Sequence, residues 1–151
     1  MYKAKPLLVS ACLVGVGCRF DGGDKMDHAV LRALKGKVFI PICPEQLGGL
    51  RTPRLRAAIE AGDGLLILEG KARVVNEGGE DVTENFLRGA HQALNIARLT
   101  GAEAAVLKEG SPSCGVERIV RGGAVVKGTG VTAALLLRGG LQVISEERVE
   151  G

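Results

Sequence analysis

Three of the four cysteines in this 151-residue sequence lie at predicted bends rather than inside apolar runs. Cys12 stands in SACLVG, Cys43 in PICPEQLGG and Cys114 in LKEGSPSCG, each close to serine, proline or glycine. A cysteine that only fills space typically lies within an apolar run, as a small buried hydrophobic group. These three positions therefore favour thiols that share a chemical site. Cys18, in GVGCRFDG, follows no predicted strand and is left unassigned.

Reduced thiols point to a small set of cofactors. Soft thiolate ligands select zinc, copper(I) or iron–sulfur clusters. A structural zinc site usually presents short Cys-x₂₋₄-Cys spacings, which this sequence lacks. Three thiolates on a four-iron cluster would leave one iron open to a substrate atom, as a Lewis acid. Two alternatives stay open, a non-catalytic carrier of clusters or sulfur and a zinc hydrolase with three thiolates and a water.

Polar side chains accompany the cysteines. Glu45, two residues after Cys43, is a candidate general base, or else a solvated loop carboxylate. Ser111 and Ser113 flank Pro112 and are candidates for contacting a substrate or orienting water, although serine is also common in ordinary turns.

Several charged residues lie near these motifs. Arg51, Arg54 and Arg56 either steer an anion or are simply solvated. Arg19 and Asp21, in CRFDG, are expected to form a local ion pair that orders the first loop.

The composition limits the functional classes. With a net charge of +3, scattered cations, one Tyr, three Phe and no Trp, nucleic acid is not expected as the primary ligand. No apolar run approaches the ~20 residues of a membrane span, so no membrane role is expected. We expect a cytoplasmic protein, where thiols stay reduced. Hydrophobic residues at 46% and charged residues at 25% indicate one globular domain over 1–151, with a monomer as a working expectation.

Hydrophobic patterning predicts alternating strands and helices. Strands are expected over 6–11, 37–42, 103–108 and 141–146, helices over 27–34, 81–101 and 130–140, and a small hairpin over 64–76. This order favours a Rossmann-like, doubly wound α/β fold with a mostly parallel sheet, helices on both faces and the hairpin as an insertion. The pattern does not determine the strand order.

Helix ends carry recognisable signals. Asp27 is a candidate cap, Asp81 with Glu84 a candidate capping box, and Gly101 a stop signal. Thr129 is a candidate cap for the helix that begins in GTGVTAALLL, and this glycine-flanked start is a candidate anion site.

This topology brings the cysteines together. Cys12, Cys43 and Cys114 each follow a predicted strand. Parallel strands end at the same edge of a sheet, which is where open α/β sheets bind ligands. We therefore expect the three thiols to meet at that edge.

The assembled motifs resemble those of a small bacterial family whose characterised members are iron–sulfur-dependent thiouracil desulfidases. The matching stretches are SACLVGVGCRFDGG, CPEQLGGLRTPR, GEDVTENF, LKEGSPSCG and GTGVTAALL, in this order over almost the whole chain. Two stretches depart from the pattern: Phe20 stands where tyrosine is usual, and LRAAIE after Arg54 lacks a proline.

The resemblance implies a cofactor, a reaction and a set of site residues. It implies a [4Fe–4S] cluster bound by Cys12, Cys43 and Cys114, with the fourth iron open to the sulfur of the substrate. It gives Glu45 an acid/base role and places the serines of the Ser-Pro-Ser-Cys motif in the pocket. The implied reaction converts 2-thiouracil to uracil and sulfide without net redox change, so no nicotinamide or flavin is implied.

Overall fold

The computed structural model describes residues 4–150. Its centre is a sheet of four parallel strands in the order β2 (Phe39–Ile42), β1 (Leu7–Ser10), β5 (Ala104–Leu107) and β8 (Gln142–Ser145). All four strands fall within the runs expected from the sequence. The predicted α/β class with a mostly parallel sheet is confirmed, and the structure adds the strand order.

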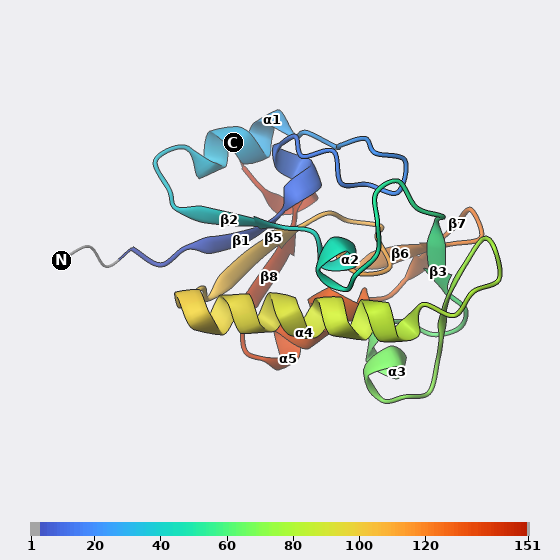
Figure 1. Ribbon diagram of the computed structural model, residues 1–151. Helices are drawn as coiled ribbons and strands as arrows, with labels where there is room; N and C mark the ends of the chain where they lie inside the picture. The colour runs from blue at the N-terminus through green and yellow to red at the C-terminus, as the bar shows by residue number, and fades with distance from the viewer. Residues whose placement is uncertain (1–3, 151) are drawn as a thin grey trace.

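Helices cover both faces of the sheet (Figure 1). The short η1 (Ala11–Val14) and α1 (His28–Leu34) lie on one face, and α4 (Thr83–Thr100) and α5 (Val131–Arg138) lie on the other. Neighbouring strand residues alternate between the two resulting hydrophobic clusters, Leu8 packing with the α4 side and Val9 with the α1 side. This alternation is the period of two expected for a strand that is buried on both faces.

The helix-end predictions are mostly correct. Asp27 caps α1 by accepting the N–H of Val30 at 3.0 Å, and Gly101 ends α4 with a left-handed φ of 77°. At the start of α4, the Asp81 carboxylate accepts the N–H of Thr83 at 2.9 Å. This short turn replaces the expected capping box with Glu84.

The hairpin expected over 64–76 is wrong. Its first half is a helix, α3 (Gly64–Leu68), which begins where Asp63 accepts the N–H of Leu65 at 3.1 Å. Its second half is β4 (Val74–Asn76), which pairs antiparallel with β3 (Ala57–Ile59). A short apolar run such as GLLIL does not distinguish strand from buried helix, and the capping aspartate decides the outcome.

A second antiparallel ribbon was not predicted. β6 (Arg118–Arg121) and β7 (Ala124–Lys127) join through Gly122 and Gly123, both with positive φ. Two β-prone runs separated by Gly-Gly are a hairpin signal in the sequence. Arg121 docks this ribbon on β3 by donating to the carbonyls of Ile59, at 2.7 Å, and Gly62. The two ribbons lie together beyond the carboxyl edge of the sheet (Figure 1).

No helix within residues 4–150 has the length and apolar character needed to cross a membrane.

Candidate active site

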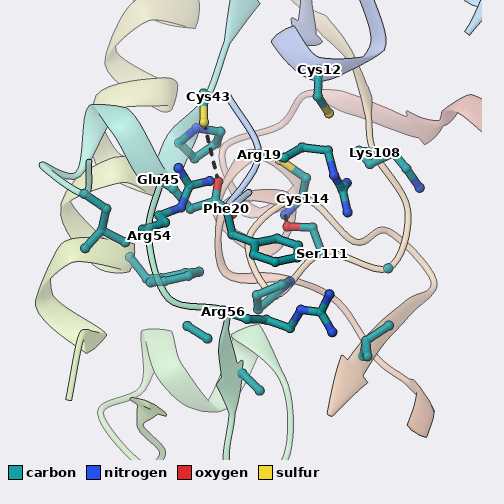
Figure 2. Close-up of a pocket in the computed structure, with 18 of the residues that line it drawn as sticks. Cys12, Arg19, Phe20, Cys43, Glu45, Arg54, Arg56, Lys108, Ser111 and Cys114 are labelled. Carbon is teal, nitrogen blue, oxygen red and sulfur yellow. Dashed lines mark hydrogen bonds between the residues drawn. The ribbon is translucent and has the colours of Figure 1, made fainter. Parts of the chain in front are cut away.

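All four cysteines border one cavity of about 590 Å³ at the carboxyl edge of the sheet. Figure 2 shows three of them, Cys12, Cys43 and Cys114, around this cavity. Cys12 follows β1 on η1, Cys43 follows β2 and caps α2 (Pro44–Leu47), and Cys114 lies in the loop after β5. Cys18, which the sequence left unassigned, lies in the loop after η1. All four are free thiols.

The two serines organise the loop that carries Cys114. Ser111 Oγ accepts the backbone N–H groups of Ser113 and Cys114, both at 3.1 Å. Ser113 Oγ donates to Oε1 of Glu45 at 2.9 Å and lies 3.6 Å from the sulfur of Cys114. Ser111 borders the cavity, whereas Ser113 is 1% exposed and lies behind its wall. The structure thus joins Glu45 to the loop after β5.

Helix α5 holds the same loop from behind. The N–H of Val131 donates to the carbonyl of Pro112, and those of Thr132 and Ala133 donate to the carbonyl of Ser113, at 2.9–3.1 Å. The anion site expected at this helix start is therefore wrong, because the loop already occupies its N–H groups. The expected cap, Thr129, lies just before the true N-cap, Gly130. A Cβ at Gly130 would lie 2.5 Å from the backbone of Ser113, which explains the glycine.

Glu109 is a buried acidic residue at the base of this loop that the sequence analysis did not single out. It is 3% exposed. Its Oε1 accepts the N–H groups of Val116 at 2.7 Å, Glu117 at 3.1 Å, Arg118 at 3.2 Å and Gly110 at 3.3 Å. The carboxylate is therefore the common acceptor for four backbone N–H groups and stabilises the loop that bears Ser111 and Cys114. A charged residue directly after a buried strand in LKEGSPSCG was the available signal.

Two glycines allow the backbones of α2 and α4 to approach closely, and this contact positions Cys43 and Glu45. A Cβ at Gly48 would lie 1.9 Å from the carbonyl oxygen of Asn85, and a Cβ at Gly89 would lie 2.0 Å from that of Pro44. Asn85 also donates its side-chain N–H to the carbonyl of Gly48 at 2.9 Å. The position of Glu45 therefore depends on a backbone contact with a distant helix.

The arginines after α2 have distinct positions. Arg54 donates to the carbonyl of Cys18 at 2.9 Å, and the Arg56 guanidinium lies 4.3 Å from the ring centre of Phe20. Both border the cavity, whereas Arg51 is exposed away from it.

The local ion pair expected between Arg19 and Asp21 is absent from the described chain, residues 4–150. The Asp21 carboxylate instead accepts the N–H of Gly23 at 2.8 Å. The backbone donor is two residues away and already fixed by the turn, so it takes the carboxylate and leaves Arg19 to face the cavity.

Burial favours neutral thiols in the metal-free protein. It raises the pKa of Cys12 to about 11, while Arg19 and Lys108 offset part of the effect. Burial, followed by the negative charge of Glu45, also raises the pKa of Cys114. Lys108 is held at the cavity by an ion pair with Glu146 at 2.9 Å.

Cys43 and Cys18 interact directly. Interaction with the neighbouring thiol, followed by burial, raises the pKa of Cys43, and the same interaction lowers the pKa of Cys18. The sulfur of Cys43 also lies 3.7 Å from the carbonyl oxygen of Cys18 and 3.9 Å from Oε1 of Glu45. The fourth cysteine is thus part of the same site.

The donor set fits a polynuclear cluster better than a single ion. Within residues 4–150, no three His, Cys, Asp or Glu side chains lie close enough to share one metal ion. The ligands of a single zinc all lie within ~2.0–2.3 Å of one centre. The cysteines of a four-iron cluster each bind a different iron, so they line a cavity at wider spacing. Thiols on three separate strand ends match the second arrangement.

A cavity lined by thiols, a carboxylate and serine hydroxyls lies at the carboxyl edge of a parallel α/β sheet. This arrangement is typical of α/β enzymes that hold a metal cofactor on cysteine side chains. The chain matches the family model of 2-thiouracil desulfurase over residues 7–148 and belongs to this family. The recognition of iron–sulfur-dependent desulfidases in the sequence motifs is confirmed.

Individual relatives agree with the family assignment. The chain is 43% identical over 146 residues to the "Uncharacterized protein YbbK" of Bacillus subtilis (strain 168), a match that covers 95% of this chain and 97% of that protein. It is 42% identical to TudS, described as a [4Fe-4S]-dependent thiouracil desulfidase. The two structures superpose with a TM-score of 0.81, covering 96% of this chain and 93% of TudS.

Proposed function

We propose that this enzyme removes the sulfur of a thiolated nucleobase such as 2-thiouracil, giving the oxo base and sulfide, with a [4Fe–4S] cluster on Cys12, Cys43 and Cys114. The observation that carries this proposal is the single cavity that these three thiols share with Glu45. The likeness to TudS supports the cofactor and the substrate class.

A four-iron cluster on three cysteines would keep one iron without a protein ligand, and that iron would supply a Lewis acid for the soft thiocarbonyl sulfur. The protein contributes thiols that burial keeps protonated in the metal-free state at Cys12 and Cys114. Cluster assembly must therefore release protons, as metal binding by thiols generally does.

Glu45 is the general base of the proposed reaction. It borders the cavity from the start of α2, where its carboxylate accepts the hydroxyl of Ser113 at 2.9 Å. The Ser113 hydroxyl holds the carboxylate in one orientation, so Ser113 acts as a positioning residue. Glu45 takes a proton from the attacking water, and the departing sulfur is protonated as it leaves.

Ser111 is the serine that faces the substrate. It borders the cavity, and its oxygen accepts two backbone N–H groups. Because the Ser113 hydroxyl donates to Glu45, the Ser111 hydroxyl donates to Ser113 Oγ at 3.2 Å and extends the chain of hydrogen bonds from the cavity to Glu45. The overall change replaces C=S by C=O, with water supplying the oxygen and sulfide leaving. No electron is gained or lost, so the reaction consumes no reductant.

The proposal is tested by anaerobic reconstitution followed by a sulfide-release assay on 2-thiouracil. We expect many turnovers per protein and a visible iron–sulfur spectrum. Glu45→Gln should keep the spectrum and lose sulfide release. Glu77→Gln, which changes a cavity carboxylate on the ribbon side, should keep both. A protein that binds a cluster but yields at most one sulfide would instead be a cluster or sulfur carrier.

A further inference from the structure

Phe20 sits at the tip of a hydrogen-bonded turn that borders the cavity. The N–H of Gly22 donates to the carbonyl of Arg19 at 2.8 Å, and the N–H of Arg19 donates to the carbonyl of Gly23 at 3.1 Å. The N–H of Arg54 donates to the carbonyl of Phe20 at 2.7 Å. These bonds fix the backbone that carries the ring before any substrate arrives.

The ring of Phe20 is not a core side chain. It is half-buried and belongs to neither of the two hydrophobic clusters formed by residues 4–150. Phe86, which also borders the cavity, is 2% exposed and packs in the larger cluster. Packing alone therefore does not account for an aromatic residue at position 20.

Guanidinium groups support the ring. Arg56 lies 4.3 Å from its centre and Arg19 lies 6.0 Å away. A cation over an aromatic face is attracted to it, so Arg56 helps to hold the ring in place. Figure 2 shows the ring between Glu45 and Ser111, with Arg56 beside it. An aromatic surface thus stands next to the groups that carry the proposed chemistry.

We propose that Phe20, supported by Arg56, is the surface on which the flat ring of the substrate stacks. This inference rests on the proposed function and deepens it, because it makes planarity of the thiocarbonyl ring a selection criterion. Bases stack on aromatic side chains through their faces, whatever their edge substituents. A saturated, puckered ring with the same thiocarbonyl group loses this contact.

The test pairs two substrates with matched variants. 2-Thiouracil and 5,6-dihydro-2-thiouracil share the thiocarbonyl and both ring N–H groups, but only the first is flat. Phe20→Leu should reduce the preference for 2-thiouracil in kcat/KM by about tenfold, mainly through KM, and Phe20→Tyr should retain it. Leu55→Ala, at an apolar side chain that borders the same cavity and is 51% exposed, should leave the preference unchanged. Comparing ratios cancels the different intrinsic reactivities of the two substrates.

A second readout does not depend on turnover. Saturation-transfer NMR on the cluster-free protein should show 2-thiouracil in contact with the wild type and a weaker signal with Phe20→Leu. An unchanged preference in Phe20→Leu, or NMR signals that are equal in the two proteins or absent from the wild type, would overturn the stacking role. If the wild type releases no sulfide, the proposed function fails, and the NMR comparison alone then decides the role of Phe20.

Discussion

Ser113 donates its hydroxyl hydrogen to Glu45 across 2.9 Å, although the two residues are 68 positions apart in the chain. One comes from the loop after β5 and the other from α2. The hydrogen bond aligns the proposed proton-transfer group with the loop that carries Cys114.

Ser113→Ala removes the group that orients Glu45. We expect kcat to fall about tenfold or more, with the cluster spectrum retained and KM changed little, because Ser113 is buried behind the cavity wall. Steady-state kinetics on reconstituted protein give the result. Ser145→Ala is the matched control, since Ser145 is also 1% exposed but bonds Glu147 away from the cavity. Equal kinetic losses in both variants would contradict the positioning role.

Glu109→Gln places an amide N–H₂ among backbone donors that now meet a carboxylate. We expect the free energy of unfolding of the cluster-free protein to fall by about 3 kcal/mol, because buried donors lose a charged acceptor. Urea unfolding measures the change. Glu103→Gln, at a side chain that is 69% exposed, should cost less than about 1 kcal/mol. Similar losses in both variants would show that Glu109 does not hold the loop.

Gly89→Ala has two opposing effects on the free energy of unfolding, and the destabilising effect is the larger. Helix propensity alone favours alanine by about 1 kcal/mol. The new Cβ, however, would lie 2.0 Å from the carbonyl of Pro44, so α2 must move. We expect net destabilisation of about 1–3 kcal/mol and weaker cluster retention. A stabilised variant would show that the contact between α2 and α4 is loose.

Single cysteine-to-serine variants test the proposed ligand set. Cys12→Ser, Cys43→Ser and Cys114→Ser should each lose most of the iron bound after reconstitution. Cys18→Ser should retain it, although Cys18 borders the same cavity. Iron and sulfide analysis of the four proteins decides the matter. Loss of iron in Cys18→Ser with retention in another variant would assign that ligand position to Cys18.

The raised pKa of Cys12 predicts a pH dependence in the cluster-free protein. The folded-state pKa is about 11 against an ordinary value of 9.0, so the unfolded chain loses its proton first as the pH rises. The resulting stability is fully present below pH 9 and is lost as the pH approaches 11, by up to about 3 kcal/mol for this residue. Urea unfolding at several pH values should show the decline. Cys12→Ser should show a shallower decline, and an identical one would contradict the assignment.

The strands of the central sheet, and the meeting of the thiols at one edge of it, could be predicted from the sequence. Leu7–Ser10 and Ala104–Leu107 are apolar enough to be recognised as buried strands, and a bend after a parallel strand can lie only at one edge. Features set by distant partners were not recoverable. The carbonyls of Pro112 and Ser113, which come from an earlier loop, occupy the N–H groups at the start of α5. Local patterning carries no information about such contacts.

The hydrogen bonds between the start of α5 and the Ser-Pro-Ser-Cys loop limit which parts of the enzyme can be altered. Because Pro112 and Ser113 supply the acceptors for the first turn of that helix, displacing the loop would leave these N–H groups without partners. Changes that broaden the substrate range are therefore expected on another wall, where the Gly122–Gly123 turn of the β6–β7 ribbon borders the cavity. A library designed to accept bulkier thiocarbonyl compounds belongs on that wall.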